Sequence, residues 1–258
     1  AAAEAAAAVC AALTRARPVL WARLAGRTAR DAAAATLAAG AGGLHLSVPL
    51  LGGRRARASL AGRVARAVAQ ARAQGLAVAV GGEEASRADF ALVRDVIAAA
   101  EAAGAHRFRF ADTAGVLHPL QTHALFRRLC AETDLELEFH GHDDRGLATA
   151  NTFAAVQGGA THVSVSVLGL GARAGSASLQ EAAAAIRLSP LHHTRVETAR
   201  LPGLAALVAR AARPALPPLA ACRAMPLRPL PPTALIPLDS TPVLRPLTPA
   251  ATFGLAAE

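Results

Sequence analysis

Lysine and tyrosine are absent from this 258-residue sequence, and Asn151 is its only asparagine. A Schiff-base aldolase needs a lysine amine as its nucleophile, and a Walker-type loop needs a lysine to reach the phosphates of its nucleotide. The absence of lysine therefore excludes both classes of protein.

Cysteine is also scarce. Cys10, Cys130 and Cys222 lie far apart in the chain and show no CxxC spacing. This pattern argues against a disulfide framework and against a thiolate zinc site.

Long hydrophobic runs are absent as well. No apolar run reaches the roughly 18 to 20 residues that a membrane-spanning helix needs. The alanine-rich start carries the acidic Glu4, where a signal peptide would have basic residues. We therefore expect a cytoplasmic protein without a membrane partner.

The formal net charge is +9, and all 27 of the positive charges that produce it are arginines. These arginines are dispersed along the chain, and aromatic residues, which could stack on bases, make up only 3% of the sequence. The abundance of alanine and the loss of lysine and tyrosine affect the whole chain, which indicates a coding bias and not one binding surface. We predict no nucleic-acid partner.

Residues 1–200 alternate between short apolar or β-branched runs and alanine-rich helical stretches. This rhythm is typical of a parallel sheet with crossover helices. The predicted strands are Pro18–Leu24, Gly43–Val48, Leu76–Val80, Arg107–Phe110, Leu135–His140 and His162–Val167. The predicted helices are Ala29–Ala39, Ala58–Ala73, Ala88–Ala103, Pro119–Glu132 and Leu147–Gln157. We predict an α/β fold, an incomplete TIM barrel with about six of the eight β/α units.

Residues 201–258 have a different composition. Eleven of the sixteen prolines lie between Pro214 and Pro249. Because proline removes the backbone donors that helices and central strands use, we predict an irregular, poorly ordered tail after the barrel. A proline-rich segment that binds a partner is the alternative.

Two histidines share one predicted strand end in the segment EFHGHDDRG, Glu138–Gly146. Side chains alternate between the faces of a strand, so His140 and His142 project to the same side. In a TIM barrel the carboxyl ends of the strands form the active-site mouth. The pair could chelate a divalent metal, although two histidines separated by one residue on a strand are also compatible with a structural role.

Polar residues follow two neighbouring strands at the same edge. RFRFADTAG leaves Asp112 and Thr113 at the barrel mouth. Glu83 and Glu84 come directly after another strand, where one of them could orient a ketone. The alternative for this acidic pair is a solvated helix start, since glutamate there favours the helix dipole.

A glycine-rich loop follows the last predicted strand, within His162–Glu181. Such loops allow backbone amides to approach a carboxylate or a phosphate, although a single glycine loop is weak evidence.

Several long strings of residues, in order, closely resemble homocitrate synthases of the nitrogen-fixation type. This group belongs to the same family as isopropylmalate synthase and hydroxymethylglutaryl-CoA lyase. The resemblance covers about residues 1–190 and is carried by the strings ASRAD, RFRFADTAGVLHP, LELEFHGHDDRGLATAN and GGATHVSVSVLGLGARAG. The last glycine loop lacks the catalytic cysteine of the lyase branch, which favours a synthase.

The resemblance implies a Claisen condensation in which acetyl-CoA adds to the ketone of 2-oxoglutarate at a divalent metal. Magnesium, manganese and zinc all tolerate a site of histidine and oxygen ligands. By the resemblance, His140, His142 and Ser176 would bind the metal. Glu83 and Thr113 would serve catalysis. The substrate-binding residues would be Thr113, Arg109 and Asp112.

The sequence also departs from the family pattern. The opening strand and its metal-binding motif have no counterpart, because residue 1 aligns with about the second helix of the family. The loop reads GARAGSA instead of GERAGNA, so Ala172 and Ser176 replace a glutamate and a metal-binding asparagine. The family's C-terminal region is not recognisable after about residue 200.

These departures leave several readings open. The chain could be a fragment, a degenerate paralogue, or one part of a split enzyme that is inactive alone. Its partners would then be a homo-oligomer or another chain that supplies the missing barrel strands. The alternative functions are an isopropylmalate or citramalate synthase and a non-catalytic barrel remnant that binds a partner or metabolite.

Overall fold

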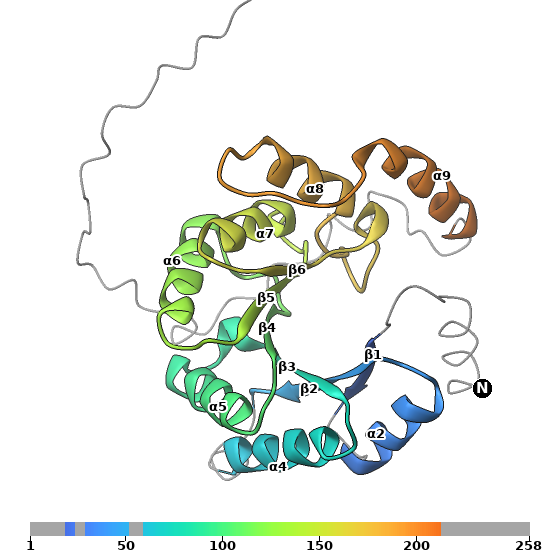
Figure 1. Cartoon of the computed structure of the whole chain (residues 1–258). Coiled ribbons are helices and arrows are strands. Elements are labelled where there is room, and N and C mark those ends of the chain that lie inside the picture. Colours follow the sequence, from blue (N-terminus) through green and yellow to red (C-terminus); the bar gives the residue numbers. More distant parts are fainter. Residues whose placement is uncertain (1–18, 24–28, 52–58, 213–258) are drawn as a thin grey trace, which may run out of the picture.

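The computed structural model describes residues 19–23, 29–51 and 59–212. Within these ranges the chain forms one parallel sheet with the strand order β1-β2-β3-β4-β5-β6 (Figure 1). The strands are β1 (Val19–Arg23), β2 (Gly43–Pro49), β3 (Ala77–Glu83), β4 (Arg107–Asp112), β5 (Glu136–Gly141) and β6 (His162–Ser164). Sequential order with parallel pairing is the arrangement of successive β/α units.

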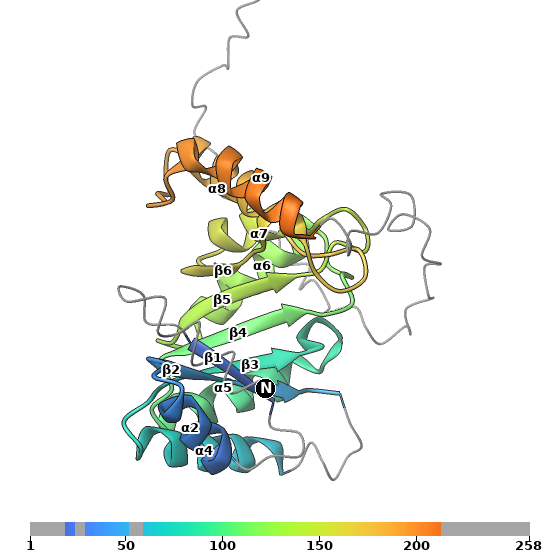
Figure 2. The same ribbon diagram turned by 90° about the vertical axis from the view of Figure 1, so that its right-hand side faces the viewer.

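Helices cover the convex face of the sheet, and the concave face is turned toward the interior around which the sheet curves (Figures 1 and 2). The α-helices are α2 (Ala29–Ala38), α4 (Leu60–Arg72), α5 (Phe90–Ala102), α6 (Pro119–Cys130), α7 (Ala148–Gln157), α8 (Leu179–Leu188) and α9 (Leu201–Ala212). Three short 3-10 helices lie between them, η1 (Ala85–Arg87), η2 (Val167–Gly169) and η3 (Thr198–Arg200). The described part of the chain is therefore an α/β barrel wall that curves around an open interior.

The hydrophobic core lies between the sheet and the helices. On β4, Phe108 and Phe110 are buried in this core, and they alternate with Arg107 and Arg109. Phe126 of α6 contacts Phe110 edge to face, with ring centroids 6.1 Å apart. Because strand side chains alternate between faces, this pattern places the aromatic residues against the helices and the arginines in the barrel interior.

Ion pairs join neighbouring strands across the barrel interior. Arg109 Nε donates to Glu138 Oε1 at 2.6 Å, and these side chains are only 13% and 7% exposed. Nearer the amino ends of the strands, Arg107 donates to Glu136 at 2.8 Å, where Glu136 is 46% exposed. Only the first pair is therefore shielded from solvent.

The structure confirms the predicted fold class, with six strands in the described residues. The predicted strand Leu76–Val80 is longer than expected, since β3 continues through Gly81 and Gly82 to Glu83. A Cβ atom on Gly81 would lie 2.3 Å from Nε2 of His45. A Cβ on Gly82 would lie 2.7 Å from Leu50, so both positions in this part of the strand require glycine, which the sequence alone did not reveal.

The segment after residue 200 begins differently from the prediction. Leu201–Ala212 forms the helix α9, so the irregular tail does not start at residue 201. Pro202 lies in the first turn, where a missing N–H leaves no intrahelical hydrogen bond unmade. The proline-rich remainder, residues 213–258, lies outside the described residues.

None of the helices in the described ranges has both the length and the apolar character that crossing a lipid bilayer requires.

Candidate functional site

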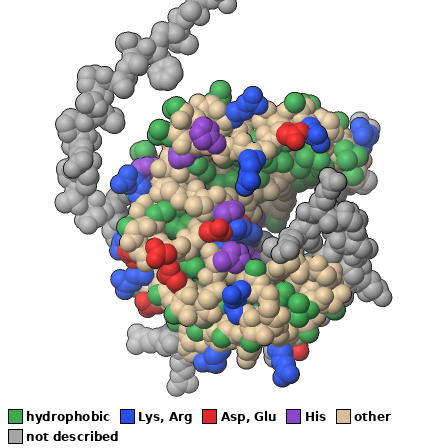
Figure 3. All heavy atoms as spheres, viewed as in Figure 1, with side chains coloured by type: hydrophobic (Ala, Val, Ile, Leu, Met, Phe, Trp, Pro, Cys, Tyr) green, Lys and Arg blue, Asp and Glu red, His purple; other side chains and the backbone are tan. Residues whose placement is uncertain are grey.

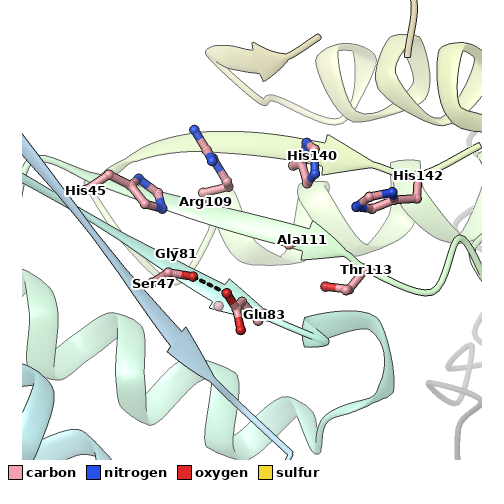
Figure 4. A pocket seen from close by; sticks show the side chains of 10 residues that line it. His45, Ser47, Gly81, Glu83, Arg109, Ala111, Thr113, His140 and His142 are labelled. Carbon is pink, nitrogen blue, oxygen red and sulfur yellow. Dashed lines mark hydrogen bonds between the residues drawn. The ribbon is translucent and has the colours of Figure 1, made fainter. Parts of the chain in front are cut away.

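A cavity of about 260 Å³ opens on the concave face of the sheet. Ten residues line it, and they come from β2, β3, β4 and β5 and the positions directly after these strands (Figure 4). The space-filling view in Figure 3 shows histidine, arginine and acidic side chains gathered beside the hollow of this face. The cavity thus lies where a β/α barrel places its active site.

The two histidines of the HxH segment both line this cavity. His140 is in β5 and His142 follows the strand, with ring centroids 4.9 Å apart and the rings at 80°. Gly141 between them lies on the other face, where an added Cβ would meet the Phe139 ring at 2.8 Å. The glycine therefore allows the strand to pack closely while both imidazoles face the cavity.

The surroundings of both imidazoles lower their pKa and so favour the neutral form. Burial, followed by the charges of His142 and Arg109, lowers the pKa of His140 from 6.5 to about 4. Burial, followed by the charge of Arg173, lowers the pKa of His142. Only neutral imidazole has a lone pair for a metal, so both rings are held in the form that can act as ligands.

The donor set fits a divalent cation in part. Nδ1 of His140 and Nδ1 of His142 are buried and have no hydrogen-bond partner in the described part of the chain. Buried nitrogen atoms without a partner are unfavourable unless a ligand satisfies them. Within residues 19–23, 29–51 and 59–212, however, no group of three histidine, cysteine or acidic residues is arranged to hold a metal. The pair would therefore provide two ligands of a larger set.

Thr113 lies at the cavity directly after β4. Its Oγ1 accepts a hydrogen bond from the backbone N–H of Glu84 at 2.8 Å. Because a hydroxyl can accept and donate at once, the Thr113 O–H remains able to donate to a ligand in the cavity. Figure 4 shows this side chain turned toward Glu83.

Glu83 faces the cavity as the last residue of β3. Its Oε1 accepts a hydrogen bond from Ser47 Oγ at 2.6 Å (Figure 4). Glu84 instead adopts a left-handed conformation with φ of 58° and pairs with Arg87 at 3.3 Å. The chain turns at Glu84, so Glu83 is the member of the acidic pair that lines the cavity.

Arg109 also lines the cavity, but Asp112 does not. Asp112 is fully buried, and its carboxylate accepts hydrogen bonds from Ser86 Oγ at 2.6 Å and from the backbone N–H groups of Val116 and Leu117 at 3.0 Å. This carboxylate stabilises the turn after β4. Because Asp112 does not line the cavity and its carboxylate already accepts these hydrogen bonds, its contact with the substrate stays a prediction.

Ser176 lies beside His142, to which it is joined by an antiparallel β-bridge. It is not among the residues that line the cavity, and its Oγ is 2.9 Å from Oγ of Ser166. To bind a metal, Ser176 would have to give up this hydrogen bond, so its role as a ligand stays a prediction.

Two cavity residues with polar side chains were missed by the reasoning from sequence. His45 and Ser47 lie on β2, within the segment GLHLSVP. They are polar residues at alternate positions of an otherwise apolar strand, and this alternation is the signal that could have identified them.

His45 should make the stability of the chain depend on pH. Burial, followed by the charges of Arg109 and Arg107, lowers its pKa from 6.5 to about 3. Between these values the unfolded chain binds a proton that the folded chain does not, so stability should fall as the pH decreases through this window. This histidine would contribute up to about 1.4 kcal/mol per pH unit. Urea unfolding at a series of pH values would measure the slope.

The matched variant is His45→Gln, which keeps a polar side chain but does not titrate. Its free energy of unfolding should vary less steeply with pH than that of the wild type. Equal slopes for the two proteins would contradict a neutral, buried His45.

The comparisons with known proteins agree with this arrangement. Residues 1–208 match the sequence profile of the HMGL-like family. A homocitrate synthase from Frankia alni is 45% identical in an alignment of 174 residues that covers 64% of this chain and 49% of that protein. Homocitrate synthase 1 from Nostoc sp. is 41% identical in an alignment of 182 residues that covers 68% of this chain and 48% of that protein. The chain thus spans about half the length of these curated relatives.

Among solved structures, the HMG-CoA lyase from Brucella melitensis superposes with a TM-score of 0.67. The match covers 81% of this chain and 80% of the lyase at 20% sequence identity, so it shows a shared fold. The resemblance predicted from the motifs is confirmed. Because the profile match extends over residues 1–208 of 258, the chain belongs to the HMGL-like family.

Proposed function

We propose that this chain carries the oxo-acid site of a homocitrate synthase-like acyltransferase. In the overall reaction the methyl carbon of acetyl-CoA, after loss of a proton, adds to the ketone carbon of 2-oxoglutarate. Hydrolysis of the thioester then releases homocitrate and CoA. The observation that supports this proposal best is the convergence of His140, His142 and Thr113 on one cavity that Arg109 and Glu83 also line.

The cavity suits a small anion. Its volume of about 260 Å³ is near the lower limit for ligand pockets, and would hold a compact oxo-acid but not a whole coenzyme. Arg109, which Glu138 holds at 2.6 Å, lines the cavity with a guanidinium that has further N–H donors, and the Thr113 hydroxyl can donate to a carboxylate. Both features favour a negatively charged substrate.

His140 and His142 would hold the divalent cation, of the magnesium, manganese or zinc type. When bound, such a cation polarises the ketone carbonyl as a Lewis acid. The chain itself keeps both imidazoles neutral through burial, and it holds Glu83 at the same cavity through the hydrogen bond from Ser47. A carboxylate at this place can orient the oxo-acid or accept a proton during the condensation.

The similarity to two homocitrate synthases supports 2-oxoglutarate as the oxo-acid. The chain spans about half the length of these relatives. We therefore also propose an acetyl-CoA site, complete turnover of both substrates, and a further copy or another chain that completes the barrel.

The decisive assay measures CoA release from acetyl-CoA in the presence of the full chain and a divalent metal. We expect release with 2-oxoglutarate. Release only with 2-oxoisovalerate or with pyruvate would identify an isopropylmalate or citramalate synthase instead. If no oxo-acid supports release and none binds, the chain is a non-catalytic member of its family.

Thr113→Val should weaken binding of 2-oxoglutarate about tenfold or more, because valine has the shape of threonine but cannot donate a hydrogen bond to a carboxylate. Isothermal titration calorimetry in the presence of Mn²⁺ would measure the dissociation constant.

Thr113→Ser is the matched control, since it keeps the hydroxyl that accepts from the Glu84 N–H. It should bind nearly as well as the wild type. Equal losses in both variants would indicate a packing effect and not a hydrogen bond to substrate.

A further inference from the structure

Arg173 joins the loops that follow three different strands. It lies in the loop after β6, and its Nε and one terminal nitrogen donate to the two carboxylate oxygens of Asp144, each at 2.8 Å. The same terminal nitrogen donates to the backbone carbonyl of Thr113. Asp144 lies in the loop after β5, and Thr113 directly after β4. We propose that Arg173 is a positioning residue that holds Thr113 and the His142 segment at the distance the oxo-acid requires.

The loop that carries Arg173 is itself held in one conformation. Arg173 has a φ of 58°, in the left-handed region that arginine adopts only at a cost. A side chain at Gly175 would place its Cβ 2.0 Å from the carbonyl oxygen of Gly169, so the loop folds closely on itself. The Gly175 carbonyl in turn accepts the N–H of Asp143 at 3.0 Å. The two-point ion pair with Asp144 offsets the unfavourable backbone conformation of Arg173.

Thr113 is consequently held from two sides. The N–H of Glu84 binds its hydroxyl oxygen at 2.8 Å, and Arg173 binds its carbonyl. Gly115, with a φ of 60°, lets this turn lie against the segment after β5, because a Cβ there would be 2.9 Å from the His142 carbonyl. The position of the Thr113 O–H relative to His142 therefore depends on these contacts between loops.

The inference rests on the proposed function, because it concerns the placement of the donor to the oxo-acid. Arg145 offers a matched control in the same region. It lies after β5 and donates to the carbonyl of Val116 at 3.0 Å, so it also links the β5 and β4 loops. Within the described residues it has no ion pair and no hydrogen bond to Thr113, and it is not among the residues that line the cavity.

The test compares binding of 2-oxoglutarate with Mn²⁺ by isothermal titration calorimetry in the full-length wild type, Arg173→Ala, Arg173→Lys and Arg145→Ala. Misplacement of a positioning contact can cost a large factor, so Arg173→Ala should bind about tenfold or more weakly. Arg173→Lys should recover only part of the loss, since lysine cannot pair with both oxygens of Asp144 through a planar fork. Arg145→Ala should lose less than about threefold.

Chemical rescue separates positioning from general destabilisation. Guanidinium ion, added well below denaturing concentrations, should restore part of the affinity of Arg173→Ala and leave that of Arg145→Ala unchanged. Wild-type affinity in Arg173→Ala, or equal losses in the two alanine variants, would overturn the inference while leaving the proposed function intact. A wild type that binds no oxo-acid would overturn the proposed function and this inference with it.

Discussion

Replacing His140 by alanine should lower the affinity of the chain for Mn²⁺ or Zn²⁺ about a hundredfold or more. The substitution removes one of the two imidazoles that face the cavity, and losses of up to about a hundredfold are seen even when only a residue behind a ligand is changed. The ring of His142, whose centroid is 4.9 Å away, would then remain alone. Equilibrium dialysis with metal analysis would measure the affinity and the stoichiometry.

The control for this variant is His123→Ala on α6, which removes a histidine that does not line the cavity. It should bind metal as the wild type does. If His140→Ala retained the wild-type affinity, the two-histidine metal site would be wrong whatever family the chain belongs to.

Glu138→Ala should destabilise the fold by about 3 to 5 kcal/mol. The change leaves Arg109, which is 13% exposed, as a charge in the barrel interior without the 2.6 Å hydrogen bond to Glu138. Taking one partner from a buried pair is costly because the remaining charge loses its closest counter-charge while little solvent can reach it. Urea unfolding monitored by circular dichroism would give the free energy of unfolding.

Glu136→Ala removes the nearer of the two carboxylate partners of Arg107, which also lies 3.7 Å from Glu138. The Arg107 and Glu136 positions are paired on the same two strands, two residues before Arg109 and Glu138. Because Glu136 is 46% exposed, solvent compensates for its loss, and the change should cost at most about 1 kcal/mol. Similar losses of unfolding free energy in Glu138→Ala and Glu136→Ala would mean that the barrel interior is equally hydrated at both ion pairs. A large difference would show that the buried pair replaces part of the apolar filling usual in β/α barrels.

The predictions that the structure confirmed rest on local patterns in the sequence. Alternating apolar strands and alanine-rich helices follow from periodicities of two and 3.6 residues, which depend only on neighbours in the sequence. The same periodicity places His140 and His142 on one face, so their joint exposure to the cavity needed no knowledge of the rest of the fold. The boundaries were less predictable. The strand that ends at Glu83 passes through Gly81, where the lack of a side chain leaves room for His45, which lies 36 residues earlier.

The roles of the polar residues depend on partners distant in the sequence. Asp112 looked like a substrate contact, but Ser86, 26 residues away, and two backbone amides use its carboxylate. Arg173 reaches Thr113 across 60 residues and Asp144 across 29. No local pattern indicates such pairings, since they arise only when the loops after successive strands are brought to one edge of the sheet.

The sequence by itself determines the α/β class of this chain, the order of its strands and the presence of two histidines on one face, because these properties follow from local side-chain alternation and from long motif strings. Only the tertiary structure decided that His45 and Ser47 belong to the cavity and that Asp112 supports a turn. Burial, hydrogen-bond satisfaction and loop contacts set those roles, and each is a property of residues that folding brings together.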